Sequence, residues 1–393
     1  MTTLWRHLPT VFQTWSIPDL TKDGEAKALF KKLSQNTGLE KTPRASCTDQ
    51  MFTSLVTDVI PDEQEHDAYL CARDQIQYSI EGLNGGRLGE LTDSGQGHGV
   101  AMNNVSLIED RNGDSILDVW VADAKTHHSR YAGTVGVTRS GVNVAGFLKT
   151  YWQISEVALV TTKIGGFKVT TPDHWVLRLS LFGRSESDLP VLAGVLKAVG
   201  GSAAWNVDAS ISYARQRLRA TSRGSETKKF VNLASGRRDD PHLVKLAAAL
   251  EAAGLGKKAD RGGTIHLVPA PFIVATYGRR PSLMPLSSGS CFSRIKDYLI
   301  KAARAANFDP ANPDPDLGVP VEKIATASWG SHSFRRGADK RAREFCIRMG
   351  IDLKVVDKVF GWKEAEHSRD MQLHYDEATL QRRFREAQVT WDV

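Results

Sequence analysis

The chain has few cysteines and no long apolar run, and each absence removes a class of protein. Its 393 residues include four cysteines, none in a CxxC pair, so a zinc ribbon or zinc finger is not expected. Scattered thiols in a chain of this length are typical of a reducing compartment. No apolar run approaches the roughly 20 residues that span a bilayer, and the first residues do not form a signal peptide. We therefore expect a soluble, intracellular protein with no membrane partner.

The residues that are abundant indicate a folded protein with a positive balance. Hydrophobic residues make up 41% of the chain and charged residues 24%, which are ordinary values for a globular protein. The formal net charge is +6, which suits a polyanionic partner without specifying one. A single core rarely extends beyond about 250–300 residues. Two domains, or one domain with a large insertion, are therefore expected.

The spacing of apolar residues predicts a mainly helical α+β fold with a small antiparallel sheet. Helices are expected at 49–60 before Pro61, at 66–83, at 141–155 and over most of 331–386. Strands are expected on both sides of a polar turn within 115–138, again within 156–185, and at 228–234. The remainder of 188–305 is expected to be helical with basic loops such as YGRRPS, and 307–320 to be an exposed loop.

The stretch SHSFRRGADKRA opens the last helical region. Ser331 is the expected N-cap, which places His332 and Arg335 three residues apart on one helical face. An imidazole, a guanidinium and the N–H groups of a helix N-terminus would then face one spot, an arrangement that suits a phosphate. HxxR alone is also compatible with a solvated basic helix start.

Two later segments extend this pattern. FGW (360–362) follows one further predicted helix, and MQLHY ends at Tyr375. HSFRRG, GW and HY in this order resemble the tyrosine recombinases, the phage-integrase family, and especially versions carried by mobile elements. The family pattern is an arginine, a lysine, HxxR, a histidine or tryptophan, and a tyrosine. The resemblance therefore implies an arginine and a lysine upstream.

Both upstream residues are present. LNGGRLGEL supplies Arg87 after a predicted helix, with Glu90 three residues further on, and VADAKTHHSRYAG supplies Lys125 at the predicted turn. The candidate catalytic residues are therefore Arg87, Lys125, His332, Arg335, Trp362 and Tyr375.

Alternatives to these assignments stay open. Lys149 or Lys163 could replace Lys125, and His367 could replace Trp362. Arg87 is also compatible with a structural ion pair to Glu90. By themselves, the tyrosine and the tryptophan could be ordinary core aromatics.

The resemblance implies a phosphotyrosine mechanism. The two arginines would hold the non-bridging oxygens of a DNA phosphate in bidentate bonds, while Tyr375 attacks the phosphorus. A phenol titrates near pH 10, so it needs help to lose its proton, and His332 can supply it. Lys125 is the candidate acid for the departing 5′ hydroxyl, and Trp362 would pack against the site. The 3′-phosphotyrosyl link would be resealed without a metal or other cofactor.

The resemblance covers about 47–160 and 281–386. We expect 1–45 to be a short N-terminal segment, a reduced DNA-binding arm at most, and 46–393 to be the catalytic domain, with an inserted region at about 160–280. The gap between Trp362 and Tyr375 is about one helical turn longer than the commonest spacing.

The function implied is a site-specific DNA recombinase or integrase that acts on duplex DNA as a synapsed homo-tetramer. The final helix, TLQRRFREA, could exchange between protomers or pack on its own domain. A type IB topoisomerase-like enzyme and a catalytically idle, recombinase-derived DNA-binding protein are the alternatives. The location would be the nucleus of a eukaryote, or the cytoplasm or nucleoid of a prokaryotic or phage-infected cell.

Overall fold

The computed structural model describes residues 25, 45–86, 88–92, 99–121, 130–181, 183–199, 207–219, 230–256, 265–277, 280–306, 315–360 and 377–391. Contacts divide the chain into one unit of Met1–Pro43 and another of Arg44–Val393. All elements discussed below belong to the second unit. It is an α+β structure, mainly helical with small antiparallel sheets, which confirms the expected class.

Within the described residues the largest sheet has six antiparallel strands, in the order β3-β2-β1-β6-β5 with β4 paired to β2. The strands are β1 (Val105–Glu109), β2 (Ser115–Val121), β3 (Arg130–Tyr131), β4 (Thr134–Val135), β5 (Leu159–Ile164) and β6 (Phe167–Pro172). The expected strands around a polar turn correspond to β2 and β4, which pair with Leu117 opposite Thr134. The short strand β3 lies within the stretch expected to be the turn and pairs with β2, with Val121 opposite Arg130.

The helices outside this sheet also follow the predicted pattern. They are α3 (Asp49–Ser54), α4 (Ile60–Glu63), α5 (Ala68–Asn84), α6 (Leu88–Leu91), α7 (Val144–Ile154), α11 (Ser288–Ala305), α12 (Ser331–Met349), α13 (Lys354–Val359) and α14 (Glu377–Ala387). None of the described helices combines the length and apolar character needed to cross a membrane.

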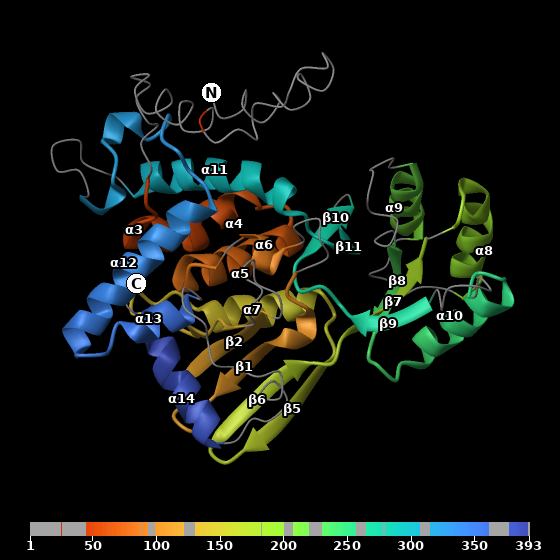
Figure 1. Ribbon diagram of the computed structural model, residues 1–393, viewed down its shortest axis with the longest axis horizontal. Coiled ribbons are helices and arrows are strands. Elements are labelled where there is room, and N and C mark those ends of the chain that lie inside the picture. The colour runs from red at the N-terminus through yellow and green to blue at the C-terminus, as the bar shows by residue number, and fades with distance from the viewer. Residues whose placement is uncertain are drawn as a thin grey trace. The chain divides into compact units, whose positions relative to one another are not determined.

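Alternation along the short strands lets one sheet serve two hydrophobic cores. Leu107 and Leu117 belong to the main core, which also holds side chains of α5 and α7. Their neighbours Ile108 and Ile116 belong to a smaller cluster that includes Leu380 of α14. Successive strand residues point to opposite faces, so α7 and α14 cover opposite faces of this sheet (Figure 1).

The last described helix, α14, is fixed to its own sheet by a buried ion pair. Arg383 donates to the carboxylate of Asp118 on β2, and its guanidinium carbon lies 3.5 Å from the centre of the Tyr131 ring. Burial lowers the pKa of Arg383 to about 10. A buried charge without its partner would be strongly destabilising. The sequence left open whether TLQRRFREA exchanges between protomers or packs on its own domain. In this structure it packs on its own domain.

The first helical region does not end at Pro61 as expected. α3 passes into a π-helical stretch, Leu55–Val59, and then into α4. Pro61 stands in the first turn of α4, where a missing N–H is tolerated. The expected exposed loop at 307–320 lies partly outside the described residues. Its described end is only partly exposed, because Gly318 and Pro320 are exposed while Leu317 and Val319 are buried in the main core.

Residues 175–269 form a part with its own core, which we call the β7–β9 module. It contains a three-stranded sheet of β7 (Trp175–Ser180), β8 (Phe230–Gly236) and β9 (Ile265–Pro269), and the helices α8 (Leu189–Val199), α9 (Val207–Arg219) and α10 (Pro241–Ala252) (Figure 1). Leucines of all three helices pack on β7 and β8, in a cluster separate from the main core. The module lies within the stretch expected to be inserted.

Three strands in this part of the chain were not predicted. They are β9, β10 (Val274–Tyr277) and β11 (Arg280–Pro285), and the last two pair as a hairpin across the supposed loop YGRRPS. Prolines stand in or beside each of them, at 269, 271, 281 and 285. Proline argues against a strand interior, so the local pattern indicated a loop.

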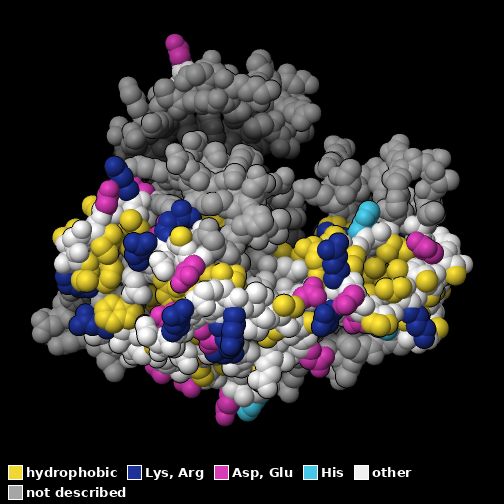
Figure 2. All heavy atoms as spheres, turned by 90° about the horizontal axis from the view of Figure 1, so that it is seen from below, with side chains coloured by type: hydrophobic (Ala, Val, Ile, Leu, Met, Phe, Trp, Pro, Cys, Tyr) yellow, Lys and Arg dark blue, Asp and Glu magenta, His cyan; other side chains and the backbone are white. Residues whose placement is uncertain are grey.

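The surface is mixed in character. On the face shown in Figure 2, Lys and Arg side chains lie interspersed with Asp, Glu and apolar side chains. Cations on and beside the main sheet are in ion pairs: Lys149 of α7 and Lys168 of β6 each lie 2.8 Å from Glu109 of β1. Exposed ion pairs of this kind contribute little to stability.

Two glycines cap helices in the left-handed conformation and differ only in their surroundings. Gly85 follows α5 with φ 62°, and Gly350 follows α12 with φ 67°. A Cβ at Gly85 would lie 2.5 Å from the Phe360 ring, whereas none of the described atoms lies within 4 Å of one at Gly350. The turn after α5 therefore requires glycine for two reasons, and the turn after α12 for one.

We expect Gly350→Ala to lower the free energy of unfolding by roughly 1 kcal/mol, from backbone strain alone. Gly85→Ala should lower it by about 2–4 kcal/mol, because overpacking against Phe360 adds to the same strain. Urea unfolding of both variants measures the difference. Equal losses would show that Phe360 does not pack against Gly85.

Candidate functional site

The HxxR sequence lies at the start of α12. The helix begins at Ser331 with Gly330 as its N-cap, so the expectation that Ser331 is the cap is wrong by one residue. Ser333 supplies the capping hydroxyl, because its Oγ accepts the Gly330 N–H at 3.3 Å. His332 and Arg335 are thereby the second and fifth helical residues.

A pocket of about 530 Å³ opens beside this helix start. His332 and Arg335 both line it, so the structure brings these two predicted residues to one cavity. The full lining is Phe292, Ser328, Trp329, Gly330, Ser331, His332, Ser333, Arg335, Arg336 and Asp339. Two arginines, Arg335 and Arg336, therefore line this pocket beside the positive end of a helix dipole, which favours an anion.

Arg335 connects three segments of the chain. Its Nη1 donates to the Gly85 carbonyl oxygen at 3.3 Å, and its Nη2 donates to the Phe360 carbonyl oxygen at 3.1 Å. Gly85 precedes Arg87 by two residues, and Phe360 precedes Trp362 by two. The guanidinium of Arg335 therefore joins the HxxR helix to two other segments. One is the turn after α5, which precedes Arg87 in the sequence, and the other is the first residue of the FGW segment.

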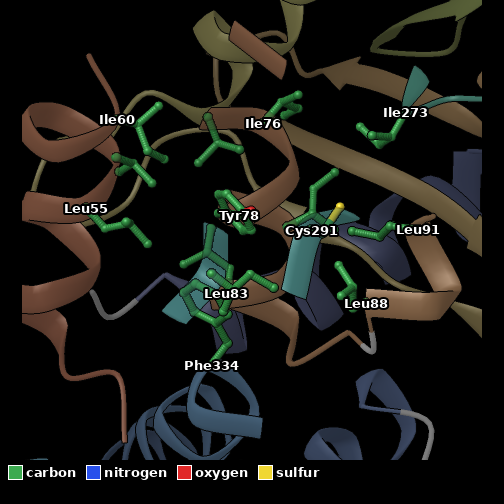
Figure 3. Packing of buried hydrophobic residues seen from close by; sticks show 14 of the residues in the cluster. Leu55, Ile60, Ile76, Tyr78, Leu83, Leu88, Leu91, Ile273, Cys291 and Phe334 are labelled. Carbon is green, nitrogen blue, oxygen red and sulfur yellow. The ribbon is translucent and has the colours of Figure 1, made fainter. Parts of the chain in front are cut away.

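The helix that carries Arg335 is held firmly against α5. Tyr78 of α5 stacks on Phe334 of α12 with ring centres 5.8 Å apart, and Figure 3 shows both side chains in the core with Leu83. Arg341, nearly buried, donates to the Gly82 carbonyl at 2.6 Å and to the Cys47 carbonyl at 3.1 Å. These contacts fix the position of α12, which lines the pocket, relative to the end of α5.

Arg343 links α12 to α13. Arg343 lies 2.7 Å from Asp339 and 2.9 Å from Asp357. Burial raises the pKa of the Asp339 carboxyl, although Arg343 opposes this effect. The bridge joins α12 to α13, and α13 leads directly into Phe360. Arg343 therefore helps to orient the segment that Arg335 holds.

Four of the six candidate residues lie outside the described residues: Arg87, Lys125, Trp362 and Tyr375. The alternative His367 lies outside them as well. Lys125 belongs to the eight residues, 122–129, that link the paired strands β2 and β3. Of its alternatives, Lys149 is in an ion pair with Glu109, and Lys163 is exposed on β5.

Sequence reasoning missed a buried carboxyl near this site. Glu81, in the last turn of α5, has no exposed surface; Gln77 donates to its Oε1 at 3.1 Å, and its Oε2 has no hydrogen-bond partner among the described residues. Burial raises its pKa to about 8, and the nearby Glu90 adds to this, while the Gln77 amide opposes it. A glutamate near a helix end is normally exposed, so no sequence signal marked it.

A second pocket, of about 260 Å³, shares no lining residue with the first. It lies where the β7–β9 module joins the main core, and both described non-glycine residues with positive φ, Glu156 and Leu283, line it. His174 also lines it, and burial lowers the pKa of this imidazole to about 4. Throughout the described parts of the chain, His, Cys, Asp and Glu side chains form no group of three that could hold a metal ion.

Comparison with protein-family models, with curated proteins and with solved structures finds no significant match for this chain. The case for a function therefore depends on the motif residues and on the contacts around Arg335.

The carboxyl of Glu81 should make stability depend on pH. Its pKa is about 8 in the folded protein and near 4.5 when unconstrained, so between these values only the folded state holds the proton. Stability should then fall as pH rises from about 5 to 8, by at most about 1.4 kcal/mol per pH unit.

We expect Glu81→Gln to flatten this part of the pH profile, because glutamine keeps the shape and cannot ionise. Unfolding free energies from denaturant titrations at pH 5, 6.5 and 8 provide the measurement. The exposed Glu65→Gln serves as the control and should keep the wild-type profile. An unchanged profile in Glu81→Gln would mean that this carboxyl is not buried in the neutral form.

Proposed function

We propose that the chain is a DNA strand-exchange enzyme of the tyrosine recombinase class, with a catalytic domain over 46–393 and Tyr375 as the nucleophile. One observation carries the proposal: Arg335 holds the carbonyls of Gly85 and Phe360. If the motif had arisen by chance, nothing would require the residues just before Arg87 and Trp362 to contact the same side chain.

The described part of the site suits a phosphodiester. A guanidinium carries five N–H donors in a planar fork, so Arg335 can hold two backbone carbonyls and still donate to a phosphate oxygen. The carbonyl bonds would orient the fork before DNA arrives, which reduces the entropy lost on binding. His332 lines the same pocket and would assist transfer of the tyrosine proton.

The other roles follow from the family resemblance. Arg87 would share the phosphate with Arg335, Lys125 would protonate the leaving 5′ oxygen, and Trp362 would pack against the site. Tyr375 would form a 3′-phosphotyrosyl bond as the 5′ oxygen leaves, and a second 5′ hydroxyl would reverse the step on another strand. No metal or cofactor takes part in this scheme.

Recombination of this kind needs two duplexes, and we propose a homo-tetramer on paired DNA sites. The buried pair of Arg383 and Asp118 holds α14 to its own sheet. This supports an assembly in which α14 stays with its protomer. Integration, excision and resolution all use the same chemistry, and any of them fits this site.

A duplex with a nick close to the cleavage site would trap the enzyme, because the short fragment with the free 5′ hydroxyl diffuses away after cleavage. We expect a covalent protein–DNA adduct, stable in SDS, with a substrate taken from repeats that flank the gene. Tyr375→Phe should abolish the adduct, because phenylalanine has no nucleophilic oxygen. An adduct that survives in Tyr375→Phe would contradict the proposal. Relaxation of supercoiled plasmid without strand exchange would identify the topoisomerase-like alternative.

Arg335→Lys should slow adduct formation by about 10²–10³-fold, since losing one preorganised donor to a developing charge has this effect in other enzymes. Lysine keeps the charge but cannot span both carbonyls and a phosphate. Arg348→Lys, at the far end of the same helix, is the matched control and should react at the normal rate. Single-turnover cleavage kinetics with saturating enzyme would measure both. A normal rate in Arg335→Lys would exclude this arginine from the site.

A further inference from the structure

The positive charge of this chain is concentrated in one part of it. The β7–β9 module, residues 175–269, contains 15 Lys and Arg and 8 Asp and Glu, a net charge of +7. The whole chain has a net charge of +6, so everything outside the module has a net charge of −1. The part that carries the candidate catalytic residues therefore has no excess of positive charge with which to hold DNA.

Within the module the charge is again localised. Residues 215–229 contain six Lys and Arg and one Glu, a net charge of +5. The described members, Arg215, Arg217 and Arg219, are exposed in the last turns of α9. A run of like charges at this density repels itself unless a polyanion neutralises it.

The geometry of α9 presents these arginines outward. Ala214 is fully buried in the module core, and Arg215 beside it is exposed. Arg217 lies over the Tyr213 ring at 4.9 Å and donates to its hydroxyl at 2.7 Å, while Arg219 is in an ion pair with Glu186 at 2.7 Å. The helix therefore holds its basic side chains in place by local contacts and keeps its apolar face inside.

The module is built as a separate unit with adjoining ends. Trp175, where β7 begins, pairs with Pro269, where β9 ends, so the chain leaves and returns at neighbouring points. Its leucine core is distinct from the main core. An insertion with adjacent ends and its own core can add a binding surface without disturbing the domain that carries it.

Elsewhere, many described cations are in internal ion pairs. Lys149 and Lys168 share Glu109, Arg343 bridges Asp339 and Asp357, and Arg383 is buried against Asp118. Phosphate binding depends on cations that displace counterions from DNA. The excess of Lys and Arg over Asp and Glu is concentrated in the module.

We infer that the β7–β9 module is a second DNA-binding unit, which holds phosphates of the substrate duplex other than the cleaved one through the basic end of α9. The inference rests on the proposed function in one respect, that the substrate is duplex DNA. The contact is electrostatic and independent of base sequence, because phosphates carry no sequence information.

The test uses the full chain with Tyr375→Phe, so that binding is measured without cleavage. In this background Arg215→Gln, Arg217→Gln and Arg219→Gln remove three positive charges from the end of α9. Binding to a duplex of about 30 base pairs, a length that spans roughly three helical turns, is followed by fluorescence polarisation at several salt concentrations. We expect affinity to fall at least tenfold and the slope of log K against log salt to decrease by about 2–3, near 0.9 per lost phosphate contact.

Two matched variants control for folding and for overall charge. Lys296→Gln, Lys323→Gln and Lys354→Gln remove three exposed charges outside the module, and this variant should keep most of the salt slope. Arg215→Lys with Arg217→Lys keeps the charge on α9 and should bind as tightly as the parent. Thermal unfolding of each variant checks that the module remains folded.

The outcomes separate this inference from the proposed function. If the parent binds duplex DNA and the module variant has the same affinity and slope, the module is not a DNA-binding unit, and the proposed function stands. If the parent does not bind duplex DNA at any salt concentration, the proposed function fails as well. If the module variant loses binding to single-stranded RNA while duplex binding is unchanged, the surface belongs to RNA and the inference is overturned.

Discussion

The structure depends on one constraint above all, the bonds from Arg335 to the carbonyl oxygens of Gly85 and Phe360. These residues are 250 and 25 positions away from the arginine. The contact is possible only because Gly85 adopts a left-handed conformation and has no side chain to displace the Phe360 ring. A glycine, an aromatic residue and an arginine from separate segments thus meet beside the proposed site.

Arginine side chains, of which Arg341 and Arg383 are buried and Arg343 is partly exposed, connect the layers around this contact. Arg341 fastens α12 to α5 through the carbonyl of Gly82, Arg343 joins α12 to α13, and Arg383 holds α14 to the sheet through Asp118. Each arginine is compensated where it lies, as burial requires. These arginines act as structural links, which leaves the β7–β9 module as the region of excess positive charge. Catalysis and affinity for DNA would then be divided between two parts of one chain.

The sequence predicted the elements whose pattern is strong. α5, α7 and α12 appear where periodicity placed them, and Gly85 ends α5 as expected. It failed at β9, β10 and β11, where helices and a basic loop were expected, and at Pro61, which lies within a continuous helical region. For the site, the spacing of His332 and Arg335 was sufficient to place both at one pocket. The buried Glu81 could not be predicted, because its burial is set by helices from distant parts of the chain.

By itself the sequence determined which residue types are available and in what order: HxxR, the later tryptophan and tyrosine, and a basic stretch at 215–229. Those are local properties, fixed by covalent order and helical repeat. Only the tertiary structure decided that the HxxR helix meets the turn after α5 and the end of α13, and that α14 packs on its own sheet. Such meetings follow from the packing of the whole core, because burial and carbonyl acceptors are supplied by segments far away along the chain.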